Sequence, residues 1–142
     1  MRILGLDLGS KTVGVAVSDP FGWTAQGLEI IRRNSENEYK QSLGRLEQII
    51  GEYEVEKIVL GYPLNLDGTV SERCLKTEGY KEKLERRFPK IPVILWDERL
   101  STVAAAGFLA EAGLDSAKRK NVIDKMAAVY ILQGYLDSIK DE

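Results

Sequence analysis

The first apolar segment, Arg2–Gly9, alternates large side chains with small or charged ones, and this period of two predicts a β-strand. One face of the strand carries leucines, at positions Leu4, Leu6 and Leu8. The other face carries Ile3 and then a carboxylate between two glycines, in the order Gly5, Asp7 and Gly9. A carboxylate within a sheet is costly unless a cation or a polar partner compensates its charge. The segment therefore predicts a sheet with an open position at Asp7. The alternative is an aspartate that faces solvent on a half-exposed sheet.

The chain has no histidine and a single cysteine, Cys74, and this absence excludes whole classes of chemistry. No Ser-His-Asp triad, histidine base or Cys-His pair can form, and a zinc site is disfavoured because zinc takes Cys or His ligands in nearly every case. Carboxylates that hold Mg²⁺ or Mn²⁺ remain as the main tool for hydrolysis at neutral pH. One cysteine allows no internal disulfide, which fits a reducing cytoplasm.

Length and charge predict one globular domain over residues 1–142, with 44% hydrophobic and 30% charged residues. The net charge of −2 gives no global basic field, so any contact with nucleic acid must come from local patches. The first residues lack the pattern of a signal peptide, and the longest apolar runs are too short to span a bilayer. We expect a cytoplasmic protein without a membrane partner; the sequence does not indicate its oligomeric state.

Periodicity predicts an α/β domain with a mixed sheet. Three strands come first and are followed by helices that alternate with two short apolar strands. The expected strands are 2–8, 12–18, 23–33, 57–61 and 91–96. The expected helices run from 35 to 53, from 71 to 88, between Ser101 and Gly113, and from 121 to 140, with a polar loop at 115–120 before the last.

Glu98 directly follows the apolar strand that ends at Trp96. Ligands of α/β sheets bind at the carboxyl ends of the strands, which favours a functional role for this carboxylate. If the strand continues, the neighbouring Asp97 points to the opposite face, so only one of the two should face the site. The alternative is a solvated loop carboxylate that pairs with Arg99.

Asp124 has a strong competing interpretation, because Asn121 precedes it by three residues in the manner of a capping box. The helix that follows is apolar nearly all round, which predicts that it is buried and brings the carboxylate into the protein. The basic cluster before it, Lys118, Arg119 and Lys120, is suited to gripping phosphates, and a solvated surface loop is the alternative.

The turn Gly9-Ser10-Lys11-Thr12 is a weak phosphate signal, since it lacks the spacing of a P-loop and leads into a strand. Ser10 and Lys11 could still touch a polyanion bound beside Asp7.

Four sequence motifs occur in order along the chain. They are Gly-Leu-Asp-Leu-Gly-Ser-Lys at 5–11, Gly-Tyr-Pro-Leu-Asn-Leu-Asp-Gly-Thr at 61–69, Trp-Asp-Glu-Arg-Leu-Ser-Thr at 96–102 and Asp-Lys-Met-Ala-Ala at 124–128. Together they closely resemble the YqgF family, also called RuvX, along essentially the whole chain. Members are described as candidate Holliday junction resolvases and as nucleases that process the 5′ end of pre-16S rRNA. The resemblance implies an RNase H-like fold: a five-stranded mixed sheet, three antiparallel strands and then two parallel ones, with helices on both faces.

The resemblance also implies that Asp7, Glu98 and Asp124 are the metal-binding carboxylates, which would hold Mg²⁺ or Mn²⁺. In the motif at 61–69, Asn65 would orient a phosphate or a ligand, and capping or turn formation is the alternative. The candidates for phosphate contact are the basic residues near the expected site, Lys11, Arg99, Lys118, Arg119 and Lys120.

The leading hypothesis is metal-dependent hydrolysis of phosphodiester bonds. The family resemblance favours pre-rRNA as substrate, and branched DNA is the alternative because nothing in the residues distinguishes the two. A second hypothesis is ATP binding, since the 7–11 turn also resembles the first phosphate loop of the actin and sugar-kinase superfamily; those proteins close two such domains on a nucleotide. A third is a non-catalytic RNA-binding assembly factor, against which the retention of all three carboxylates argues.

Overall fold

The computed structural model describes residues 2–35, 38–98 and 116–140, with the backbone alone for 116–125 and 140. The helix expected between Ser101 and Gly113 lies outside the described residues, as does Arg99.

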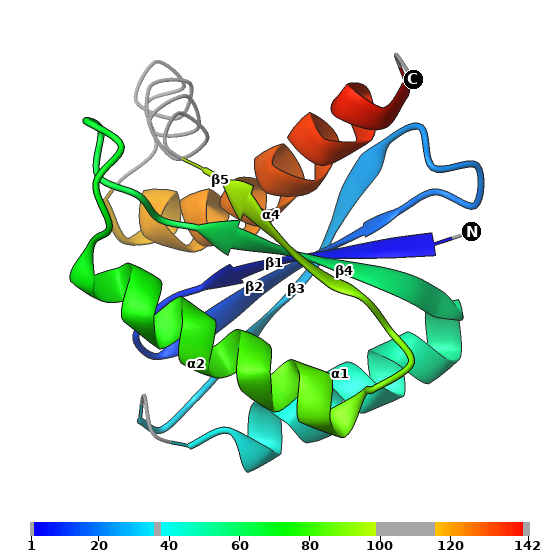
Figure 1. The fold of residues 1–142 in the computed structure, drawn as a ribbon, viewed down its shortest axis with the longest axis horizontal. Helices are drawn as coiled ribbons and strands as arrows, with labels where there is room; N and C mark the ends of the chain where they lie inside the picture. Colours follow the sequence, from blue (N-terminus) through cyan, green and yellow to red (C-terminus); the bar gives the residue numbers. More distant parts are fainter. Residues whose placement is uncertain (1, 36–37, 99–115, 141–142) are drawn as a thin grey trace.

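A five-stranded mixed sheet in the order β3-β2-β1-β4-β5 forms the centre of the molecule (Figure 1). The strands are β1 (Arg2–Leu8), β2 (Thr12–Ser18), β3 (Ala25–Arg32), β4 (Val55–Tyr62) and β5 (Val93–Asp97). The first three pair antiparallel, whereas β4 pairs parallel with β1 and β5 pairs parallel with β4. This topology confirms the predicted mixed sheet. It also brings the carboxyl ends of β1, β4 and β5 to one edge.

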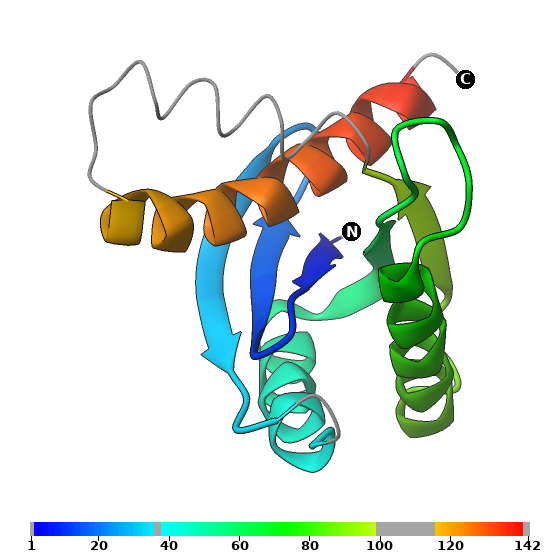
Figure 2. The same ribbon diagram turned by 90° about the vertical axis from the view of Figure 1, so that its left-hand side faces the viewer.

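Of the described helices, α1 (Lys40–Tyr53) and α2 (Glu72–Arg87) cover one face of the sheet and α4 (Ser116–Lys140) covers the other (Figure 2). Among the described helices, none is long and apolar enough to cross a membrane.

The strand period of two divides the core between these faces. The leucines of β1 pack with the apolar residues of α1 and α2, including Leu46 and Leu84. The opposite face of β1, at Ile3, packs with Ala128 and Leu132 of α4. Asp7 has the parity of Ile3 and therefore belongs to the α4 face.

Two helix starts differ from the sequence prediction. Helix α1 begins at Lys40, not directly after Ser35. Helix α4 begins at Ser116, so the loop expected at 115–120 is helical from 116 on, and 118–120 lie in its first turns. Ala, Lys and Arg are good helix formers and no Gly or Pro interrupts the segment, so the helix extends past the cap-like Asn121. Asp124 is consequently interior to α4, and the capping-box interpretation is wrong.

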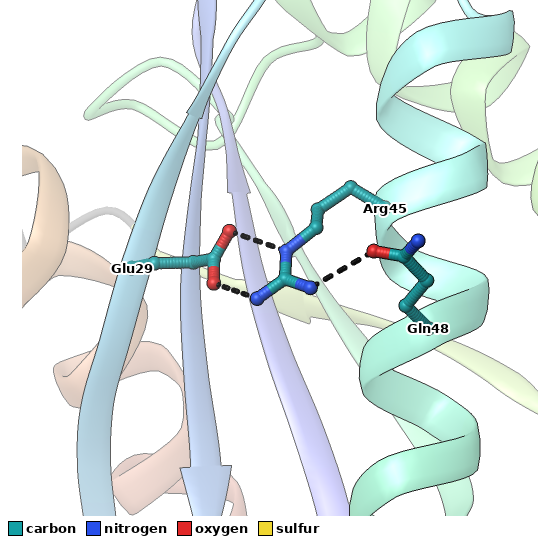
Figure 3. Close-up of polar contacts among 3 residues, drawn as sticks. All are labelled: Glu29, Arg45 and Gln48. Carbon is teal, nitrogen blue, oxygen red and sulfur yellow. Dashed lines mark hydrogen bonds and ion pairs between the residues drawn. The ribbon is translucent and has the colours of Figure 1, made fainter.

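A bidentate ion pair ties the edge strand β3 to α1 (Figure 3). The Arg45 guanidinium donates to both carboxylate oxygens of Glu29, at 2.9 and 2.6 Å, and to Gln48 Oε1 at 3.0 Å. This fork raises the pKa of Arg45. It fixes α1 against the strand on the side of the sheet away from α4.

Gly5 sets how closely α4 approaches β1. A Cβ at this position would lie 2.7 Å from Leu132 Cβ and 3.2 Å from the Ala128 carbonyl oxygen. Both distances are too short for ordinary packing, and the second neighbour is backbone. Only glycine allows α4 to lie this low on the sheet beside Asp7.

We predict that Gly5→Ala lowers the free energy of unfolding by about 1–3 kcal/mol, because α4 must move away from β1. Gly44→Ala is the control: it is interior to α1, a Cβ there meets nothing within 4 Å, and it should stabilise the protein by up to about 1 kcal/mol. Urea unfolding measures both changes. Equal effects of the two substitutions would contradict the packing account.

Candidate active site

Asp7 lies near the carboxyl end of β1, and glycines are its neighbours on the sheet. Its register partner on β2 is Gly14, and Gly61 on β4 follows Leu60, the partner of Leu6. Glycines therefore flank the aspartate on both neighbouring strands as well as along its own. Asp7 is partly buried in the sheet, and the open position that the sequence predicted beside it stays a prediction.

Glu98 follows the end of β5, and its backbone N–H donates to the Tyr62 carbonyl at 3.3 Å. Its side chain lies directly over Gly61, where a Cβ would collide with the Glu98 carboxylate and with Ile131 Cδ1. Asp97, one residue earlier, is exposed, which agrees with the predicted alternation. Sequence reasoning did not single out Gly61, because its role depends on the register between β4 and β5.

The carboxyl groups of Asp7 and Glu98 lie close together over these glycines and interact directly. Burial raises the pKa of Glu98 to about 8, and the charge and hydrogen bond of Asp7 add to the effect, with a smaller contribution from Asp97. The positive charge of Arg73 acts in the opposite direction. Without a cation, the pair thus holds a proton at neutral pH.

One oxygen of this pair has the character of a metal ligand. Glu98 Oε2 is buried and has no hydrogen-bond partner within the described part of the chain. A buried acceptor that lacks a donor is costly, and hard oxygen donors that repel each other suit a divalent cation such as Mg²⁺ or Mn²⁺. Asp7 and Glu98 are two such donors; among the described side chains, no group of three acidic, His or Cys residues completes a metal site.

The backbone of Asp124 lies in α4, one helical turn before Ala128. Positions four apart share a helix face, so position 124 lies on the face whose residues Ala128 and Leu132 pack at Gly5. The helix thus brings the third predicted carboxylate position toward the same face of the sheet. Its side chain lies outside the described residues, and its metal-binding role stays a prediction.

The turn between β1 and β2 is stabilised by hydrogen bonds from Arg33, a residue that the sequence analysis did not select. Its Nη2 donates to the carbonyl oxygens of Gly9 and Ser10, and its backbone N–H donates to the Lys11 carbonyl at 2.7 Å. Within the turn, Gly9 N–H donates to the Thr12 carbonyl at 2.8 Å. Lys11 is exposed at this end of the sheet, so its predicted contact with phosphate remains open to test.

The loop after β4 is built around Asn65, Asp67 and Thr69. Asn65 Nδ2 donates to Thr69 Oγ1 at 2.9 Å, and Asp67 Oδ1 accepts from both the backbone N–H and the hydroxyl of Thr69. Gly68 has φ +89°, which favours glycine at this turn. Asn65 therefore forms the turn; its contact with nucleic acid stays a prediction.

Arg73 is a second residue that the sequence analysis did not select. It lies in the first turn of α2, and its Nη2 donates to the carbonyl of Leu8, which directly follows Asp7, at 3.3 Å. An arginine in a first helical turn opposes the helix dipole, and this was the available signal in the sequence. The remaining basic candidates are Lys118, Arg119 and Lys120 in the first turns of α4, without described side chains, and Arg99.

The family model described as RuvX, Holliday junction resolvase, matches residues 1–138. The chain belongs to the RuvX family. Its RuvX relatives include proteins of Agathobacter rectalis and Bacillus subtilis, each 55% identical, and one of a Geobacillus strain, 58% identical. The matches cover 97–99% of this chain and 98–99% of each relative, and all three carry the name of a candidate pre-16S rRNA nuclease.

The fold of this RuvX chain is also that of RuvC. A RuvC of Thermus thermophilus, solved in complex with a Holliday junction substrate, matches with a TM-score of 0.58 at 16% identity, over 99% of this chain and 96% of that one. A second Thermus thermophilus RuvC structure gives a TM-score of 0.57. This likeness confirms the predicted RNase H-like fold.

We predict that the metal-free protein loses stability as the pH rises from about 4.5 to about 8. Glu98 keeps its proton in the folded state up to about pH 8, whereas the unfolded chain loses it near the ordinary value of 4.5. Unfolding therefore releases a proton in this window, and a higher pH favours the unfolded state. Thermal melts in chelator should show this loss in the wild type relative to Glu98→Gln. Parallel stability curves for the two proteins would contradict the assignment.

Proposed function

We propose that this protein is a divalent-metal-dependent nuclease that hydrolyses RNA phosphodiester bonds, in the cytoplasm, during maturation of the 5′ end of pre-16S rRNA. The observation that carries the proposal is the paired carboxylates of Asp7 and Glu98, with their buried and unpartnered Oε2, in a chain of the RuvX family. The names of the relatives support the reaction and the RNA substrate.

Asp7 and Glu98 would hold the metal, together with Asp124 from α4. Bound there, Mg²⁺ or Mn²⁺ supplies charge stabilisation for the reacting phosphate and lowers the pKa of a water molecule. Asp7, on a rigid central strand, anchors the site. Glu98 gives up the proton that the metal-free pair holds, because a cation replaces the proton as the partner of the two carboxylates.

The glycines around Asp7 let other parts of the protein pack close to it. Gly5 and Gly61 remove side chains from the floor of the site, where the packing of α4 and Glu98 leaves no space for a Cβ. Lys11 and Asn65 lie exposed at this end of the sheet. With Arg99, Lys118, Arg119 and Lys120, they are our candidates for contacts to backbone phosphates, which the net charge of −2 makes necessary.

Cleavage of branched DNA is the second candidate function. The description of the family model as a Holliday junction resolvase favours it. Carboxylates and a metal cleave RNA and DNA by the same displacement, so the two substrates must be compared directly.

We predict that Asp7→Asn abolishes cleavage without unfolding the protein. The asparagine keeps the size of the side chain and removes one of two facing carboxylates, so the stability of the metal-free protein should stay equal or rise. Cleavage of labelled pre-16S 5′ fragments and of four-way DNA junctions, with Mg²⁺ or Mn²⁺, measures the activity, and thermal melts of the same samples measure the stability.

The matched control is Glu56→Gln, an exposed carboxylate at the opposite end of the strands, which should cleave like the wild type. Loss of activity together with a large fall in melting temperature would make Asp7 a structural residue. Faster cleavage of the DNA junction than of the RNA would favour the second function.

A further inference from the structure

Arg73 lies in the first turn of α2, a position at which the helix dipole disfavours a positive charge. Ser71 caps α2: its Oγ accepts from Cys74 N–H at 3.2 Å and donates to the Pro63 carbonyl at 2.7 Å. Arg73 follows in the first turn, where the helix dipole favours anions such as Glu72. A neutral or acidic residue would serve the helix better, so the reason for this arginine lies outside α2.

The guanidinium of Arg73 reaches the edge of the sheet beside the carboxylates. It donates to the Leu8 carbonyl at 3.3 Å, one residue past Asp7, and its charge lowers the pKa of Glu98. Arg73 thus approaches from the α2 side, whereas Asp7 and Glu98 lie on the α4 side. A ligand that binds at Asp7 and Glu98 and extends past the end of β1 would therefore meet the positive charge of Arg73, which comes from the α2 side of the sheet.

We propose that Arg73 binds a backbone phosphate of the nucleic acid held at Asp7 and Glu98. The inference rests on the proposed nuclease function and adds a substrate contact to it. The planar fork of arginine matches phosphate geometry, and the half-buried position of Arg73 strengthens such a contact relative to one on an open surface. When a cation neutralises the carboxylates, their attraction for the guanidinium falls, and a phosphate becomes its stronger partner.

A purely structural role, in which Arg73 only ties α2 to β1, makes a different prediction for the free protein. Removal of a positive charge next to the carboxylates should tighten the binding of a cation. Loss of a structural tie should instead loosen the site, weaken cation binding and lower the melting temperature. Affinity for Mn²⁺ without nucleic acid therefore separates the two roles.

The test compares Arg73→Gln with Arg86→Gln, which removes the same charge from the exposed far end of α2, and with Arg73→Lys. Calorimetric titration of Mn²⁺ should show affinity that is equal or tighter for Arg73→Gln than for the wild type. Cleavage of the pre-16S fragment should fall about tenfold to hundredfold in kcat/KM for Arg73→Gln, with partial recovery in Arg73→Lys. Arg86→Gln should match the wild type in both measurements.

Binding of the uncleaved RNA in an Asp7→Asn background, in which one carboxylate charge beside Arg73 is removed, tests the contact apart from catalysis. The added Arg73→Gln change should lower the slope of log affinity against log salt by about 0.7, the value for one contact to a single strand. An unchanged slope, or weaker Mn²⁺ binding with a lower melting temperature, would overturn the proposal. A wild type that cleaves neither substrate while the slope still changes would refute the nuclease function and leave the phosphate contact in place.

Discussion

The close meeting of the Asp7 and Glu98 carboxylates on a glycine floor is the constraint on which the rest of the site depends. Burial disfavours the charged form of Glu98, and the nearby charge of Asp7 adds to the cost, as the raised pKa of Glu98 records. The chain accepts this arrangement at the carboxyl ends of β1 and β5, where an apolar pair would stabilise the fold. Such a local cost is typical of a functional site, and a bound cation would remove it.

The fold supplies the two elements that make this meeting possible. Parallel pairing of β1, β4 and β5 brings their carboxyl ends to one edge, so residues 91 positions apart in the chain become neighbours. Gly5 then lets α4 pack low over the same face, and Gly61 leaves space for the Glu98 side chain. The apolar clusters on the two faces hold the helices against the sheet, and the two carboxylates lie on the α4 face at the carboxyl ends of the strands.

Periodicity alone predicted the sheet, the face of Asp7 and the opposite orientations of Asp97 and Glu98, because a strand period of two is a local property. The predicted start of α4 at Asn121 was wrong, and the helix begins at Ser116. Asn121 is a residue type that often caps helices, but no residue between 116 and 121 breaks a helix. Gly61 and Arg73 could not be selected by local pattern: one depends on the register of β4 with β5, and the other on where α2 docks. The three-carboxylate set came from family resemblance, and of its members the structure brings Asp7 and Glu98 into contact.

The most direct test of the central claim is the change in unfolding free energy that Mn²⁺ produces in the wild type and in Asp7→Asn, measured by urea unfolding at neutral pH. A ligand that binds the folded state stabilises it by about 2.7 kcal/mol at a concentration one hundred times its dissociation constant. The account predicts stabilisation of that order in the wild type and little or none in Asp7→Asn at the same Mn²⁺ concentration. Equal stabilisation of both proteins, or none in either, would contradict a metal site built on Asp7 and Glu98.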